Sequence, residues 1–350
     1  MIAPPFADRP VLVLYTGGTL GMMPSAEGLV PAGDIETRLR HALDGLPPSR
    51  RSQLPEFVIH SVAAPIDSSA ATPLDWQRLA ATIADRIGHH AGIVVLHGTD
   101  TLTWTASSLA FQLQGLDRPV VVTGAMHPLE AEGSDALANI ELALRFAARP
   151  ELQEVAVAFA GHLLRGVRSS KTHSENDDAF ASPNYPLLGE QVGEDVVLYP
   201  ARCLETQQRG APRFELPDYS PLAEGGVARI ALWPGIQAWQ LEAWLGDDRV
   251  QGALLEVWGG GNIPPDPELI GVLAKASGEG KLLAAISQCR WGSIAPGRYA
   301  AGQGLIEAGV LSGDDMTPEA AIAKLVHLLA LPLDTAERRR LFLTPLVGER

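Results

Sequence analysis

The sequence predicts an α/β protein of two domains, built on a mainly parallel sheet. Short, continuous apolar runs recur along the chain, with helix-like segments between several of them. Runs that are apolar at every position are typical of strands buried on both faces, and their alternation with helices indicates parallel pairing. The length of 350 residues favours two domains. The expected strands are 11–15, 57–62, 92–96, 119–123, 155–160, 228–233, 252–258 and 281–287.

The helices between these strands carry clear start signals. Thr72 suits an N-cap, Pro73 the first helical position and Asp75 the carboxylate of a capping box. Three further helices are expected after Thr101 (ending near Gly115), after Ser134-Asp135 and after Thr317-Pro318.

A segment without sustained periodicity, 207–226, separates the two halves of the chain. It holds Pro212, Pro217, Pro221 and the pair Gly225-Gly226, which is typical of a linker between domains. We therefore expect an N-terminal domain over 1–206, a linker over 207–226 and a C-terminal domain over 227–350.

Composition and charge exclude several classes of protein. With 27 basic and 41 acidic side chains the net charge is −14, which argues against nucleic acid and anionic membranes as partners. No apolar stretch approaches the ~18 residues of a membrane span, and the first residues lack the basic start of a signal peptide. Cys203 and Cys289 form neither a disulfide framework nor a zinc motif. We expect a cytoplasmic protein with reduced thiols.

Two polar turns follow two of the predicted strands. Thr16-Gly17-Gly18-Thr19 follows 11–15, and His97-Gly98-Thr99-Asp100-Thr101 follows 92–96. The carboxyl ends of parallel strands open into one crevice, so threonine hydroxyls and a carboxylate would meet there. Such a group suggests nucleophilic attack on a carbonyl. Taken singly, Thr16 also suits an ordinary turn, and Asp100 also suits an N-cap.

A threonine nucleophile needs a base, and Lys171 is the candidate. Its amine can act as a base only when burial or neighbouring charge keeps it neutral; the alternative is a solvated surface lysine. Asp67-Ser68-Ser69 can bind a substrate carboxylate through its hydroxyls or simply cap a loop. The histidines at 89, 90, 97 and 127 lack the spacing of metal ligands, so we expect no metal site.

Together these motifs resemble those of the bacterial cytoplasmic (type I) L-asparaginases, in the asparaginase/glutaminase family. The resemblance covers nearly the whole chain. It implies a larger N-terminal domain with a mainly parallel sheet, a smaller flavodoxin- or Rossmann-like C-terminal domain, and active sites near subunit contacts in a homodimer or homotetramer. The matching segments are Thr16–Thr19, Asp67–Ser69, His97–Thr101, Thr123–Met126, Lys171–Asn184, Gly259–Asn262 and Ser287–Cys289.

The resemblance implies hydrolysis of L-asparagine to L-aspartate and ammonia through a threonine acyl-enzyme, without a cofactor. It assigns the nucleophile to Thr16 and a second catalytic set to Thr99, Asp100 and Lys171, but which of these threonines is acylated stays open. The residues expected to bind substrate are Asp67, Ser68, Ser69, Thr99, Asp100 and Asn262, the last of which would reach the site from a neighbouring subunit.

Two positions depart from the family pattern. Leu29 stands where relatives have a tyrosine that helps to activate the first threonine, and leucine cannot carry a proton. Glu256 stands where relatives that bind asparagine as an effector have an arginine. A carboxylate there would repel the effector's carboxylate, so we do not expect allosteric control.

Other functions stay open at this point. L-Glutamine is an alternative substrate, because one methylene changes selectivity by only about 10–200-fold. An inactive amino-acid sensor is a second possibility, favoured by Leu29 alone. A subunit of a tRNA-dependent amidotransferase is a third, but it would need an RNA-facing domain and a basic surface that the acidic balance does not suggest.

Overall fold

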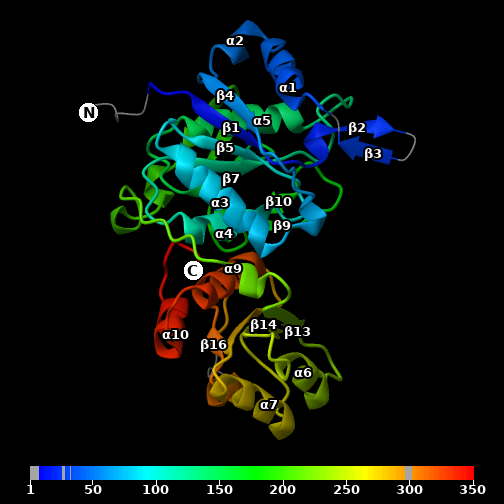
Figure 1. Ribbon diagram of the computed structural model, residues 1–350, viewed down its shortest axis with the longest axis vertical. Coiled ribbons are helices and arrows are strands. Elements are labelled where there is room, and N and C mark those ends of the chain that lie inside the picture. The colour runs from blue at the N-terminus through cyan, green and yellow to red at the C-terminus, as the bar shows by residue number, and fades with distance from the viewer. Residues whose placement is uncertain (1–7, 26–27, 32, 296–301) are drawn as a thin grey trace. The chain divides into compact units, whose positions relative to one another are not determined.

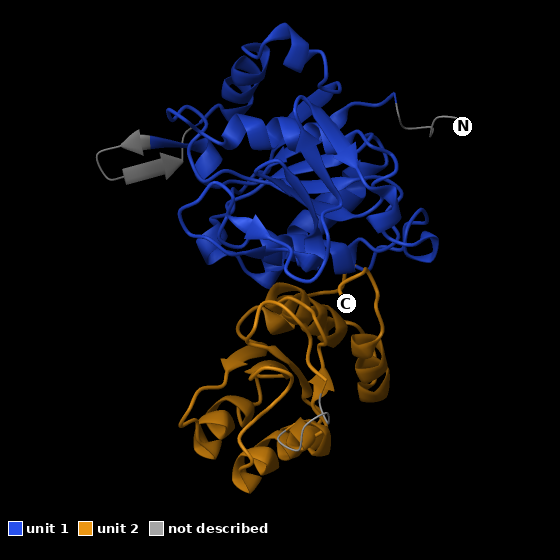
Figure 2. Ribbon diagram, turned by 180° about the vertical axis from the view of Figure 1, so that it is seen from behind, with its two compact units in different colours: residues 1–215 blue, residues 216–350 orange. Residues whose placement is uncertain are grey.

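The computed structural model describes residues 8–25, 28–31, 33–295 and 302–350. The chain forms two compact units, residues 1–215 and 216–350 (Figure 2). The division falls inside the segment 207–226, the expected linker. Among the described helices, none has both the length and the apolar character needed to cross a bilayer.

Unit 1 is built on an eight-stranded sheet with the order β12-β11-β8-β7-β6-β5-β1-β4. The five strands from β7 to β4 are parallel, and the other three continue the sheet antiparallel at one edge. The predicted α/β fold is confirmed, with this antiparallel edge as an addition. The strands are β1 (Val11–Tyr15), β4 (Phe57–Ser61), β5 (Ile93–Leu96), β6 (Val120–Thr123), β7 (Val155–Phe159), β8 (His162–Arg165), β11 (Gly189–Val192) and β12 (Asp195–Leu198).

Helices cover both faces of this sheet (Figure 1). Apolar residues of α1 (Ile35–Asp44) and α5 (Ala136–Ala147) share one core with β1, β5 and β6. On the other face lie α3 (Pro73–Ile87) and α4 (Leu102–Gln112), while α2 (Pro48–Arg51) follows α1. The capping box expected before α3 is present, since the backbone N–H of Thr72 donates to Asp75 at 2.8 Å.

Two short ribbons and several 3-10 turns lie outside the main sheet of unit 1. The turn η1 (Thr19–Gly21) leads into the hairpin of β2 (Met22–Ser25) and β3 (Gly28–Pro31). A second ribbon pairs β9 (Ser170–Lys171) with β10 (Phe180–Ala181), so that Lys171 lies opposite Phe180. The remaining turns are η2 (Ser68–Ala70), η3 (Gly166–Arg168), η4 (Pro200–Arg202) and η5 (Thr206–Gln208).

Unit 2 is a smaller α/β unit with its own core. Its four strands are all parallel, in the order β13-β14-β15-β16, as expected for the C-terminal domain. The strands are β13 (Val227–Ala231), β14 (Gly252–Val257), β15 (Leu282–Ser287) and β16 (Leu311–Ser312). The helical segments are η6 (Ser220–Leu222), α6 (Ala238–Leu245), α7 (Pro267–Gly278), α8 (Gln303–Glu307), α9 (Pro318–Ala330) and α10 (Thr335–Leu343).

A buried ion pair holds the segment after α10 against α9. The Lys324 amine is fully buried and donates to the carbonyls of Phe342 at 2.9 Å and Thr344 at 2.7 Å. Its third partner is the carboxylate of Glu349, which is also fully buried. Burial lowers the pKa of Lys324, and the charge of Glu349 opposes that change. A charge can stay inside a protein only with such a complete set of partners.

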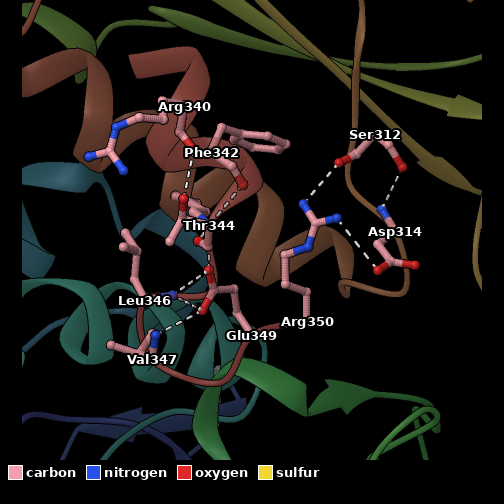
Figure 3. Close-up of polar contacts among 10 residues, drawn as sticks. Ser312, Asp314, Arg340, Phe342, Thr344, Leu346, Val347, Glu349 and Arg350 are labelled. Atoms are coloured by element: carbon pink, nitrogen blue, oxygen red, sulfur yellow. Dashed lines mark hydrogen bonds and ion pairs between the residues drawn. The ribbon is translucent and has the colours of Figure 1, made fainter. Parts of the chain in front are cut away.

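The carboxylate of Glu349 also organises its own turn. It accepts the backbone N–H groups of Leu346 at 3.0 Å and Val347 at 2.9 Å (Figure 3). The neighbouring Arg350 donates to the carbonyl of Ser312 at 3.2 Å and lies 3.5 Å from the Asp314 carboxylate. Residues 344–350 are therefore tied to α9 and to the end of β16.

Candidate active site

The first two predicted motifs lie side by side, because the strands that precede them are neighbours. In β1 and β5, Tyr15 is in register with Leu96. The chain places β4 on one side of β1 and then crosses to β5 on the other. Such a reversal in strand order is where open α/β sheets bind ligands, beyond the carboxyl ends of the strands. The turns after β1 and β5 occupy this place.

Glycines allow three loops to approach closely here. A Cβ atom on Gly18 would lie 2.5 Å from the Cα of Gly98, and one on Gly98 would lie 2.3 Å from Oγ of Ser68. The hydroxyl of Thr101 also donates to the Ser68 carbonyl at 2.7 Å. The motifs around residues 16–19, 67–69 and 97–101, far apart in sequence, thus meet at one point of unit 1.

Lys171 reaches the same point from the ribbon β9–β10. Its amine donates to Oγ1 of Thr99 at 3.0 Å and to Oδ1 of Asp100 at 2.9 Å. The hydroxyl partner is buried, whereas the Lys171 side chain is 20% exposed and that of Asp100 is 61% exposed. The amine therefore links a sheltered hydroxyl to a carboxylate that remains open to a ligand. This arrangement can move a proton between a hydroxyl and a reacting group.

Thr16 is placed differently from Thr99. It is fully buried, and its hydroxyl donates to the carbonyl of Leu96 at 2.8 Å. In this position the hydroxyl joins the end of β1 to the end of β5.

The other threonine of that turn, Thr19, begins η1 and is partly exposed. It follows Gly17 and Gly18, whose φ values of 126° and 93° turn the chain sharply. Sequence reasoning passed over this hydroxyl. A signal was available: the glycine pair marks where the chain leaves the buried strand, so the residue after it is the more accessible one.

The segment Asp67–Ser69 both caps a turn and borders the site. Oδ1 of Asp67 accepts the backbone N–H of Ser69 at 2.9 Å and its hydroxyl at 2.8 Å, and these bonds lower the pKa of Asp67. Asp67 therefore caps its own loop, which is one of the two roles expected for this segment. Ser68 is buried beside Gly98, while Asp67 and Ser69 are exposed.

His97 supports the turn rather than the chemistry. It is buried, with Nδ1 2.8 Å from the carbonyl of Gly98 and Nε2 3.1 Å from the hydroxyl of Thr105. A carbonyl only accepts, so Nδ1 carries the proton and Nε2 accepts from Thr105. Burial lowers the pKa of His97, which keeps the ring neutral.

The remaining positions singled out in the sequence belong to β14, to the turn after it and to β3. Asn262 belongs to unit 2, in the turn after β14, where it pairs with Trp258; its Oδ1 is buried without a hydrogen-bond partner in the described part of the chain. Glu256 in β14 pairs with Arg229 at 2.6 Å. Leu29 is part of β3, but its side chain lies outside the described residues.

Neither cysteine of the chain forms a disulfide. Cys203 is buried, which raises the pKa of its thiol to about 11, and Cys289 is exposed; both are free thiols. Within residues 8–25, 28–31, 33–295 and 302–350, no group of three or more His, Cys, Asp or Glu side chains could hold a metal ion.

Comparison with known proteins decides the family. Residues 10–203 match the family described as Asparaginase, N-terminal, and residues 226–342 match the Glutaminase/Asparaginase C-terminal domain. The chain belongs to the asparaginase family. Among the relatives of this asparaginase-family chain, L-asparaginase 1 of Escherichia coli (strain K12) is 37% identical over 97% of this chain and 98% of its own.

Solved structures agree with this assignment. The crystal structure of L-asparaginase I from Vibrio cholerae matches with a TM-score of 0.86 and 37% identity, over 97% of this chain and 98% of that one. The thermostable L-asparaginase from Thermococcus kodakarensis matches with a TM-score of 0.84 and 31% identity, also over 97% and 98%. The predicted resemblance and the two-unit asparaginase fold are confirmed.

Proposed function

We propose that this asparaginase-family chain hydrolyses L-asparagine to L-aspartate and ammonia. The proposal rests on the contacts of the Lys171 amine with both the hydroxyl of Thr99 and the carboxylate of Asp100. These contacts lie beyond the carboxyl ends of β1 and β5, where the strand order reverses. The asparaginases to which the chain is similar over nearly its whole length support the same substrate.

The reaction proceeds in two steps. A threonine hydroxyl attacks the carbon of the side-chain amide, the C–N bond breaks, and the nitrogen leaves as ammonia after taking up a proton. Water then attacks the resulting ester, which releases aspartate and restores the hydroxyl. Lys171 and Thr99 pass a proton to the leaving nitrogen in the first step, or take a proton from the attacking water in the second. Backbone N–H groups beside Thr99 stabilise the oxyanion, where losing one donor typically costs about 10²–10³ in rate.

The nucleophile is a hydroxyl of the turn after β1. The family resemblance assigns it to Thr16, which stays part of the proposal, but the buried hydroxyl of Thr16 donates to the carbonyl of Leu96. The partial exposure of Thr19 favours this second threonine of the same turn. If Thr19 is the nucleophile, the role of Thr16 is structural: it holds β1 and β5 in register and so positions the turn that carries Thr19.

The substrate's charged ends find partners around the same point. The exposed carboxylate of Asp100 suits the α-ammonium group, and the hydroxyls of Ser68 and Ser69 suit the α-carboxylate. Asp67 orders this segment through Ser69, and Thr99 faces the amide.

A second subunit completes the proposed site. We propose a cytoplasmic homodimer or homotetramer in which Asn262 reaches the site of a neighbouring subunit. Asn262 is only half-buried in the single chain, which leaves part of the residue available to a neighbouring subunit. Domains over 1–206 and 227–350, joined by 207–226, remain the proposed organisation. Light scattering after size-exclusion chromatography tests the assembly, and a monomer with full activity would contradict the role of Asn262.

Ammonia release from purified protein tests the activity. L-Asparagine should be hydrolysed, L-glutamine more slowly, and D-asparagine least. Thr99→Val should lower turnover by about 10²–10⁴-fold. Comparing Thr16→Val with Thr19→Val then identifies the nucleophile, because its loss should also prevent formation of the acyl-enzyme seen by mass spectrometry.

A catalytically inactive sensor is the second candidate, and Leu29 is the observation that favours it. Leucine replaces a tyrosine that carries a proton in relatives. Binding of L-asparagine in calorimetry without any release of ammonia would establish the sensor and exclude the hydrolase.

A further inference from the structure

We propose that Tyr185 is a positioning residue for Lys171, acting through the two arginines that precede the ribbon β9–β10. The inference rests on the proposed function, since it concerns the amine that would move the proton. It assigns a role to a polar network that the proposed reaction steps do not use.

The tyrosine joins the two arms of the ribbon at their base. Arg165 and Arg168 lie on the arm that leads into Lys171, and Tyr185 lies on the arm that leaves Ala181. The ring of Tyr185 has the Cζ atom of Arg165 at 4.2 Å and that of Arg168 at 5.5 Å from its centre. Both distances are within the range of cation–π attraction, which is strongest where water is excluded.

The inner arginine of this pair is held rigidly. Arg165 and Glu154 are 5% and 3% exposed and form an ion pair of 2.7 Å. Arg165 also donates to the carbonyl of Arg202 at 2.9 Å, and the hydroxyl of Tyr185 donates to the same oxygen at 2.9 Å. A buried network whose members all have partners has one preferred geometry. Tyr185 is therefore fixed at both its ring and its hydroxyl.

The ribbon needs an external anchor because it is short. Only two residue pairs form it, Lys171 with Phe180 and Ser170 with Ala181. An isolated two-stranded ribbon is marginal in water even when it is longer. One anchor is the ring of Phe180, which packs edge-on against Phe159 at 4.7 Å between centres. The contact of Tyr185 with the two arginines is another, and it joins the arm that leads into the ribbon to the arm that leaves it.

The position of the amine depends on this anchor. Lys171 has to keep its nitrogen within 3.0 Å of both Thr99 and Asp100. A displacement of about 1 Å at a reacting group can cost about 10²-fold in rate. Loosening the base of the ribbon should therefore lower kcat, while the loops around Ser68 that bind substrate stay in place.

The test compares Tyr185→Leu with Tyr185→Phe. The leucine variant loses the ring and should lower kcat for L-asparagine about 10- to 100-fold with little change in KM. The phenylalanine variant keeps the ring on both guanidinium groups and should restore most of kcat. A matched control is Phe57→Leu in β4, which removes a ring that lies 5.8 Å from Cζ of Arg40 at the opposite edge of the sheet. That control should keep its kcat.

Other outcomes overturn the proposal. A kcat for Tyr185→Leu within twofold of the original, with Lys171→Met inactive, would show that the anchor does not position the amine. An equal loss in Phe57→Leu would show a general loss of stability instead. If the original protein releases no ammonia from L-asparagine, the proposed function fails independently of Tyr185. If Lys171→Met stays active, the proposed role of Lys171 fails, and with it the need to position its amine. If circular dichroism shows that Tyr185→Leu is unfolded, Tyr185→Met, whose unbranched side chain adapts more easily to the space left by the ring, provides the same comparison.

Discussion

Two lysines of this chain each pair with a carboxylate, yet their surroundings differ completely. Lys171 in unit 1 contacts Asp100 at 2.9 Å, and both side chains keep some exposure. Lys324 in unit 2 contacts Glu349 with no exposure of either side chain. The first amine also donates to a side-chain hydroxyl, whereas the second donates to two backbone carbonyls.

This difference shows that the surroundings of a lysine–carboxylate pair decide whether the pair is suited to a reaction or to holding the fold. A hydroxyl can exchange its proton with an amine and with a ligand, and the exposed Asp100 leaves room for that ligand. Backbone carbonyls only accept, so every donor of Lys324 serves to hold the chain. The pair in unit 1 is suited to catalysis and the pair in unit 2 to stability.

Replacing each lysine by methionine should separate the catalytic role of the first pair from the structural role of the second most clearly. Lys171→Met should lower kcat by about 10²–10⁴-fold, the usual value of a general acid or base, with an unchanged thermal midpoint. Lys324→Met should keep its activity per folded molecule. Ammonia release and thermal unfolding measure the two effects, and a reversal of the pattern would refute the division.

The stability effect at Lys324 is the next largest. Removing one partner leaves the Glu349 charge buried alone, which costs about 3–5 kcal/mol. The double variant Lys324→Met with Glu349→Gln should unfold at higher urea concentration than Lys324→Met alone, because no charge is then stranded. Equal urea midpoints for the single and double variants would count against a buried charge as the cause.

A smaller effect should follow from crowding the loops of unit 1. In Gly98→Ala the new Cβ would lie 2.3 Å from Oγ of Ser68, so this serine must move. KM for L-asparagine should rise about 10- to 100-fold, the value of one hydrogen bond to a charged group. Gly88→Ala is the control, since nothing lies within 4 Å of its added Cβ. Unchanged kinetics in Gly98→Ala would remove Ser68 from the binding site.

The smallest predicted effect is the pH dependence of stability that His97 contributes. Burial lowers the pKa of His97 in the folded protein, so below the unfolded value of about 6.5 the unfolded chain binds the extra proton. Stability is then lost as pH falls, by at most about 1.4 kcal/mol per pH unit. Urea unfolding from pH 7.5 to 5 should show a weaker decline for His97→Gln. Parallel pH profiles would indicate that His97 titrates normally.

Much of the fold was predictable because its strands are continuous apolar runs and its helices begin with caps. The runs at 11–15 and 252–258 became β1 and β14 within one residue. The ribbon β9–β10 and the edge strands β11 and β12 were not predicted, because each strand has only two to four residues, too few to show a periodicity. Their pairing is set by contacts distant in sequence, which a local pattern does not contain.

The site was predictable in part for similar reasons. The ends of the apolar runs predicted the turns at Thr16 and Thr99. The exposure of each threonine depends on the direction of its hydroxyl, and the hydroxyl of Thr16 points inward. A lysine within an apolar helix, as at Lys324, gives no local sign of its buried partner 25 residues later. The network of Arg165 and Tyr185 is equally hidden, because its members come from separate segments.

The central claim is that Thr99 and Lys171 act as one catalytic unit, and a double-mutant cycle tests it most directly. kcat/KM for ammonia release from L-asparagine is measured for the original protein, Thr99→Val, Lys171→Met and the double variant. When two residues act as one unit, the effects of their substitutions on the rate are strongly non-additive. The kcat/KM of the double variant should therefore lie within about threefold of that of the slower single variant. Losses that simply multiply, or a Lys171→Met variant with near-normal kcat/KM, would contradict the account.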